Sequence, residues 1–339
     1  MIAGSVPASA LVDKLAYVFS IIVLPMIAGY IVRQRALARD PSNEQTCRRW
    51  SRTLKLICIA AFVPPIATTA MLKNPLAGTS VLVLASIGVG FLLLEASLGR
   101  AYIGLRKLPP RQGGAFLGCA AMTNMLSFGG LIVFAVWGND GLQQVYLLKL
   151  LEHVLYFGVF YPWCSTFSPD LEPQHTGLIA SFRRHPVTLV PLTAVFVGVA
   201  WNFLHYSSPS HPTGPPTWTL PINEYLMPAQ VGLLTFAVGL TLAPSRIRRY
   251  WPECLAAASI KFLIAPVVTG TAAYLCMRNG LISELGFRVA VVISSMPVAF
   301  NSLIPPALYN LDEDLANSCW LFTSAMLVVT VPVLYVVFT

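Results

Sequence analysis

The sequence predicts an all-α membrane protein with ten transmembrane helices, and three observations support this fold class. First, 56% of the 339 residues are hydrophobic and only 11% are charged, whereas soluble domains carry about 25% charged residues. Second, apolar stretches of about 20 residues, the length that crosses a bilayer, recur along the whole chain. Third, short polar segments with prolines, turn residues and charges separate these stretches.

The expected spans form two sets of five with a polar linker between them. We expect the first repeat over residues 1–163, the linker over 164–185 and the second repeat over 186–339. The linker contains prolines, acidic residues and arginines. The expected spans lie near residues 11–32, 53–72, 79–99, 113–137, 142–163, 187–206, 224–243, 252–276, 285–309 and 314–338.

The distribution of basic residues predicts how these spans are oriented. Most of the 22 Lys and Arg residues follow spans 1, 3, 5 and 7, and cytoplasmic loops carry such an excess. Both termini should therefore face outward in a multi-pass protein, which we expect in the cell (plasma) membrane. The net charge of +8 arises in these short loops, so the expected surroundings are the lipid bilayer and not nucleic acid.

Two spans contain residues that interrupt a helix, at matching positions in the two halves. The fourth span contains Asn124 to Gly130, with Asn, Ser and paired Gly, and the ninth contains Ser294 to Pro306, with three prolines. An odd number of spans in each half makes the second half thread the membrane in the opposite sense, as an inverted repeat. We therefore expect broken helices 4 and 9 to cross near the centre of the bilayer.

Such a crossing predicts a binding site for a small organic anion. Helix N-termini expose unpaired backbone N–H groups and the positive end of the helix dipole. Asn124 and Asn301 are the expected principal ligands, and Ser127 and Ser302 would add directional hydrogen bonds. The alternative is that these small residues and prolines only allow close helix packing. The matched positions of the two interruptions favour a functional site.

Ionisable residues inside the spans are candidates for ion coupling, because a charge is costly in the hydrocarbon core. Lys149, Glu152 and His153 lie on span 5, and separations of three and four residues place Lys149 on one face with the other two. Lys261 lies near the middle of span 8 and could pair with Glu95 of span 3. The coupling ion would be H+ or Na+, and a purely structural ion pair is the alternative for each group.

The patterns of enzymes and of metal or cofactor sites are missing from the sequence. Gly88-Val-Gly90 lies inside an apolar span without a preceding strand, so it does not predict a dinucleotide site. Glu152-His153 lacks the second histidine of a zinc hydrolase helix. The seven cysteines show no ligand spacing. We therefore expect no enzymatic activity, no metal and no cofactor.

Short motifs at both interruptions resemble those of the auxin efflux carrier family. Asn124 through Gly138 resembles that family's Asn-x-Gly-Phe-x-Gly-x-Pro stretch, although Leu131 stands where the family usually has proline. Pro297-Val-Ala-Phe-Asn301 resembles its Pro-x-Ala-x-Asn motif, and Tyr309 to Asp314 resembles its Tyr-Gly-x-Asp turn. The resemblance covers nearly the full length of the chain.

The resemblance implies a scaffold built from spans 1, 2, 6 and 7 and a transport domain built from the other spans. The transport domain would move as an elevator and carry a carboxylate at the helix 4/9 crossing. By the same resemblance, Gly129 and Pro297 would lie beside the substrate, and the protein would form a homodimer through its scaffold.

Two other functions stay open at the level of sequence. A sodium-coupled symporter of the bile-acid type shares the broken-helix crossing, but Asp and Glu are absent from both interruptions. A membrane receptor or scaffold that binds its ligand without moving it is the alternative from another class.

Overall fold

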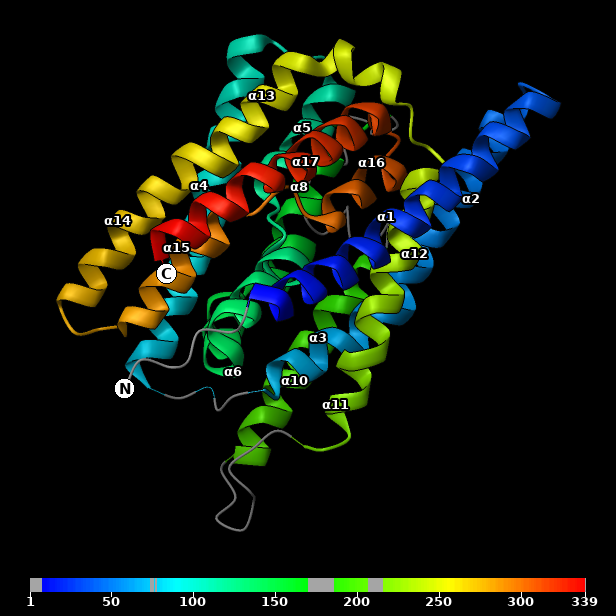
Figure 1. Cartoon of the computed structure of the whole chain (residues 1–339). Helices are drawn as coiled ribbons and strands as arrows, with labels where there is room; N and C mark the ends of the chain where they lie inside the picture. The colour runs from blue at the N-terminus through cyan, green and yellow to red at the C-terminus, as the bar shows by residue number, and fades with distance from the viewer. Residues whose placement is uncertain (1–7, 74–75, 77, 170–185, 207–215, 339) are drawn as a thin grey trace.

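The computed structural model describes residues 8–73, 76, 78–169, 186–206 and 216–338, and it is all-helical within them. Most of the expected linker, residues 170–185, lies outside the described residues. Figure 1 shows α4, α13, α14 and α17 together on one side of the molecule and α1, α2 and α12 on the other.

Helices of very different lengths make up the described chain, and wider π-type or tighter 3₁₀ turns often join one to the next. In chain order they are α1 (Ala8–Arg39), α2 (Asn43–Ile57), α3 (Val63–Met71), α4 (Thr79–Arg106), α5 (Pro110–Ala121), α6 (Leu131–Leu148), α7 (Glu152–Leu155), α8 (Tyr161–Ser165), α10 (Leu189–Tyr206), α11 (Thr219–Pro221), α12 (Met227–Gly239), α13 (Trp251–Ser259), α14 (Ala265–Arg278), α15 (Glu284–Ser294), α16 (Ile304–Leu308) and α17 (Glu313–Phe338).

Seven helical segments of the described chain are long and apolar enough to cross a bilayer. The expected spans 4 and 5 both fall in one of them, Met125–Ser165, but the backbone leaves helical geometry at Gly138, where φ is 62° and ψ is −147°, so two helices meet there. The expected spans 7 and 9 are represented by the shorter helices α12 and α15. The length and apolarity of these helices support a helical membrane protein.

The helices pack as two groups, one containing α1, α2, α3, α10 and α12 and the other containing α4, α5, α13, α14, α15 and α17. In the first group, α1 crosses α12 at two glycines whose Cα atoms lie close together. A Cβ on Gly239 would lie 2.2 Å from the Met26 carbonyl oxygen, and a Cβ on Gly29 would lie 2.3 Å from that of Phe236. Only glycine allows this backbone approach.

The interruptions that the sequence predicts in spans 4 and 9 are present, and they meet. The chain is extended at Met122 after α5 ends, and again at Ala299 after α15 ends. Thr123 and Val298 form an antiparallel bridge, in which the Asn124 amide donates to the Pro297 carbonyl at 2.9 Å. The second interruption is shorter than expected, because Pro305 and Pro306 stand in the first turn of α16, where a missing N–H is tolerated.

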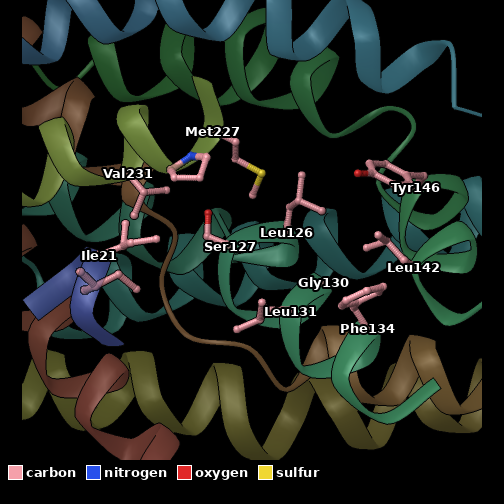
Figure 2. Close-up of a pocket in the computed structure, with 12 residues that line it drawn as sticks. Ile21, Leu126, Ser127, Gly130, Leu131, Phe134, Leu142, Tyr146, Met227 and Val231 are labelled. Atoms are coloured by element: carbon pink, nitrogen blue, oxygen red, sulfur yellow. The ribbon is translucent and has the colours of Figure 1, made fainter. Parts of the chain in front are cut away.

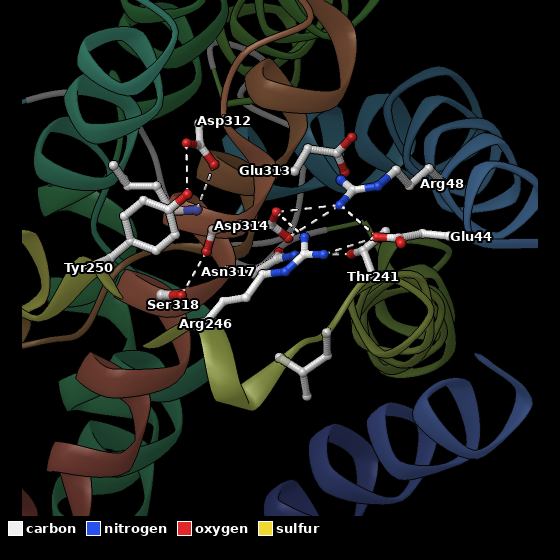
Figure 3. Close-up of polar contacts among 12 residues, drawn as sticks. Glu44, Arg48, Thr241, Arg246, Tyr250, Asp312, Glu313, Asp314, Asn317 and Ser318 are labelled. Carbon is white, nitrogen blue, oxygen red and sulfur yellow. Dashed lines mark hydrogen bonds and ion pairs between the residues drawn. The ribbon is translucent and has the colours of Figure 1, made fainter. Parts of the chain in front are cut away.

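A cluster of ion pairs joins the two helix groups at the end of the molecule where the basic loops lie (Figure 3). Arg48 of α2 lies 3.1 Å from Glu44 and 3.4 Å from Asp314 of α17. Arg246, which precedes α13, pairs with the same two carboxylates. The charged side chains of this cluster are partly exposed, so each ion pair adds little stability alone. Together the ion pairs link the two helix groups on one face.

Candidate functional site

The candidate site forms where the two interrupted helices meet, and a buried ion pair supports it from behind. Lys261 of the α13–α14 segment and Glu95 of α4 are both 0% exposed, and their charged groups lie 2.8 Å apart. The Lys261 ammonium also donates to the Ala120 carbonyl at 2.8 Å and to the Thr123 hydroxyl at 2.6 Å. The pair expected from sequence is therefore present. Its ammonium group also supplies a hydrogen-bond donor to the Ala120 carbonyl, which lies at the end of α5 where helical carbonyls lack backbone partners.

Tyr156 holds the extended peptide group between α5 and the next helical turn. Its hydroxyl accepts a hydrogen bond from the Thr123 amide at 2.8 Å and donates to the Thr123 carbonyl at 2.7 Å. The Thr123 carbonyl also accepts from the Met125 amide at 2.9 Å, but the Thr123 amide would otherwise be buried without a partner, which is costly in a membrane protein. The interruption is thus fixed by side chains from three other parts of the chain.

Asn124 begins the helical turns that follow the interruption, and its side chain is only partly used by the fold. Its Oδ1 accepts a hydrogen bond from the Phe128 amide at 3.3 Å, as an N-cap does. Its Nδ2 is buried and has no hydrogen-bond partner. Because buried polar groups normally have partners, the unpaired amide nitrogen is an available donor beside the interruption.

A cavity of about 70 Å³ adjoins this asparagine and brings together several residues that the sequence singled out. Asn124, Ser127 and Asn301 line it from the two interruptions. The two helix groups meet here, because the interruptions follow α5 and α15 of the second group and the facing wall comes from α3 and α12 of the first; α7 supplies the remaining wall. Its lining residues are Val63, Ile66, Thr123, Asn124, Met125, Leu126, Ser127, Lys149, Glu152, His153, Met227, Gln230, Val231, Leu234, Ala299, Phe300 and Asn301.

The three ionisable residues of span 5 line the same cavity. The Lys149 ammonium lies 3.0 Å from the Glu152 carboxylate, and His153 Nδ1 lies 3.7 Å from the same carboxylate oxygen. All three side chains are buried, and His153 Nδ1 has no hydrogen-bond partner. The cavity therefore contains one cation, one carboxylate and an imidazole beside the asparagines.

The other expected ligands lie behind the cavity wall. Gly129 packs against span 9, where an added Cβ would lie 2.6 Å from Ile293. Pro297 contributes its carbonyl to the backbone bridge, and the buried Ser302 hydroxyl donates to the Ala299 carbonyl at 2.7 Å. In the structure these three residues shape the interruption, and none of them lines the cavity.

Gln230 of α12 is a lining residue that the sequence analysis missed. A glutamine inside an apolar helix was the available signal, because polar side chains within a span usually face a partner or a cavity. Thr123 and Tyr156 were missed as well, since nothing in their spacing relates the two residues.

A second, apolar cavity of about 200 Å³ adjoins the polar one and shares part of its wall. Figure 2 shows Leu126 and Ser127 facing Met227 and Val231 across this space. Phe134, Leu142 and other apolar side chains complete the lining. A polar compartment beside an apolar one suits a molecule with a charged end and a less polar body.

Comparisons with known proteins point to membrane transporters. The chain is 25% identical over 335 residues to an uncharacterized transporter of Methanothermobacter thermautotrophicus, covering 94% of this chain and 97% of that protein. It is 26% identical over 219 residues to an uncharacterized transporter of Methanocaldococcus jannaschii, covering 59% of this chain and 66% of that one.

A third relative, from Rhizobium meliloti, is named "Putative malonate transporter" and is 27% identical over 209 residues, covering 60% of this chain and 59% of its own. No protein-family model matches the chain. These similarities, together with the apolar helices, support an integral membrane protein of the transporter class. They do not distinguish the auxin efflux carrier family from others.

Proposed function

We propose that this protein is a secondary carrier that moves a small carboxylate across the cell membrane, with the substrate bound where the two interrupted helices meet. The observation that carries the proposal is the buried, unpaired amide nitrogen of Asn124 in a cavity that also contains Asn301, Ser127 and Lys149. Hydrogen-bond donors and one cation in a buried space favour an anion. The relative named for malonate makes a carboxylate the first class to test.

The packing of the helices supports an elevator-type movement. α1, α2, α3, α10 and α12 would form the scaffold, and the helices that carry the interruptions would form the transport domain. The cavity lies between these groups, so that sliding one past the other would carry the site across the membrane. We propose this within ten spans arranged as two inverted repeats, residues 1–163 and 186–339, with both termini outside.

The scaffold is also the proposed surface for a homodimer. Phe196, Trp201 and Phe203 of α10 are largely exposed, and a helix of the scaffold can contact a second copy without blocking the movement of the transport domain. In a bilayer, exposed apolar side chains also contact lipid. The protein mass of the purified particle, after the mass of bound detergent is subtracted, distinguishes a homodimer from a monomer surrounded by lipid.

Counterflow in proteoliposomes tests the carrier proposal. Vesicles loaded with malonate, succinate, indole-3-acetate or cholate should take up the matching labelled anion, and Asn301→Ala should lower the rate at least about tenfold by removing a hydrogen bond to a charged group. Asn279→Ala, at an exposed asparagine far along the chain, is the matched control. Tight binding without counterflow would contradict the carrier and favour a receptor, and flux that requires sodium would favour the bile-acid type of symport.

A further inference from the structure

The candidate cavity is electrically balanced before any substrate enters. Lys149 and Glu152 are 2% and 7% exposed, and their charged groups lie 3.0 Å apart. Lys149 is the only cation among the described residues that line the cavity, and Glu152 is the only carboxylate. A bound anion would therefore compete with the Glu152 carboxylate for the Lys149 ammonium.

Adding a monovalent anion to this cavity would leave one uncompensated negative charge in a buried site. An unpaired buried charge costs several kcal/mol, and proteins avoid this cost by taking up a proton. A proton on Glu152 restores neutrality, because Lys149 can then pair with the substrate carboxylate alone. The protonated carboxyl group would also become a hydrogen-bond donor.

From this charge balance we infer that the carrier binds its anion together with one proton, which Glu152 takes up as the substrate replaces it beside Lys149. The inference rests on the carrier function proposed above. It makes the transport cycle a proton–anion symport in which the proton passes from water to the Glu152 carboxylate on one side and returns to water on the other. Net charge in the cavity stays zero in both the empty and the loaded state.

The groups around Glu152 leave it as the residue that takes the proton. On its own segment it faces Lys149, His153 and the hydroxyl of Tyr156, which is already bonded to Thr123. α12 brings Gln230 to the cavity, α3 brings only apolar side chains, and the second interruption brings Asn301.

Of the two other ionisable groups nearby, Glu95 is already paired and His153 is placed as a hydrogen-bond acceptor. Glu95 of α4 is bonded to Lys261 and Thr123 and does not line the cavity. His153 Nδ1, which has no hydrogen-bond partner, lies within 3.7 Å of Glu152 and is placed to accept a hydrogen bond from the protonated carboxyl group.

Calorimetry on the purified full-length protein tests this inference. The four carboxylates of the counterflow panel are titrated first, and the one that binds most tightly is studied in buffers of different ionisation enthalpy. Binding of a monovalent anion should take up about one proton, and binding of a dicarboxylate, which is a dianion at pH 7, about two. The affinity should fall about tenfold from pH 7 to pH 8 for each proton taken up. This step measures proton uptake by the wild-type protein alone, so its outcome does not depend on whether any variant folds.

The variants then assign the proton. Glu152→Gln mimics the protonated carboxyl group, so it should bind the same anion with about one proton less taken up and with an affinity that changes less than about twofold between pH 7 and pH 8. In vesicles it should lose accumulation driven by a pH gradient. Glu253→Gln, at a buried carboxylate of α13 outside the cavity, is the matched control and should behave like the wild type.

The possible results separate the inference from the function on which it rests. Binding without proton uptake overturns the proton inference and leaves the carrier in place, as does sodium-dependent binding without proton uptake. Proton uptake that survives in Glu152→Gln but disappears in His153→Gln overturns the assignment to Glu152. If none of the four carboxylates binds, the carrier proposal fails and this inference fails with it.

Discussion

Removing only the cation of the Glu95–Lys261 pair should damage the fold more than removing both charges. Both side chains are 0% exposed, and Lys261 donates to three groups around the first interruption. Lys261→Met leaves the buried Glu95 carboxylate without a cation, which should lower the free energy of unfolding by about 3–5 kcal/mol. The double variant with Glu95→Gln strands no charge, so the expected loss is about 1–2 kcal/mol from missing hydrogen bonds.

Unfolding with SDS in mixed micelles, followed by tryptophan fluorescence, measures the four proteins of this double-mutant cycle. The coupling free energy between the two substitutions should be about 2 kcal/mol or more, because the residues share one network. Arg39→Met, at an exposed basic residue, is the control and should change stability by less than about 0.5 kcal/mol. A double variant that loses the sum of the two single losses would refute the reasoning.

Three further predictions test the surroundings of the site and the packing of the helices. Tyr156→Phe leaves the buried Thr123 amide without a partner and should lower stability by about 1–3 kcal/mol in the same micelle assay. Gly239→Leu should lower the yield of folded protein, because its Cβ would meet a carbonyl oxygen of α1 at 2.2 Å, whereas Gly90→Ala, with no atom within 4 Å, should not. Hydrogen bonds from the hydroxyl and amide of Ser42 hold the pKa of Asp40 below its ordinary value of 3.8. The contact therefore stabilises the turn fully above pH 3.8, and this stabilisation is lost as the pH falls through the lowered pKa. Ser42→Ala should raise the pKa of Asp40 in a carbon-13 NMR titration.

Part of the candidate site could be predicted because residue type limits where a helix can continue. Asn124, Ser127 and Asn301 were expected at the interruptions and line the cavity. Gly129 and Ser302 were expected beside them and lie behind the wall. Spacing could not separate these cases, because successive side chains of an irregular segment point in directions that helical periodicity does not give.

By itself, the sequence determined the helical membrane class and the positions of the two interruptions, since apolar length and the loss of backbone hydrogen bonds at Gly and Pro are local properties. Tertiary structure alone decided that the interruptions form a backbone bridge. It also confirmed Glu95, 166 residues away, as the partner that the sequence suggested for Lys261, and it added the Ala120 carbonyl and the Thr123 hydroxyl to that contact. Such contacts depend on how packed helices bring distant residues together, and a buried charge is stable only where that packing supplies its partner.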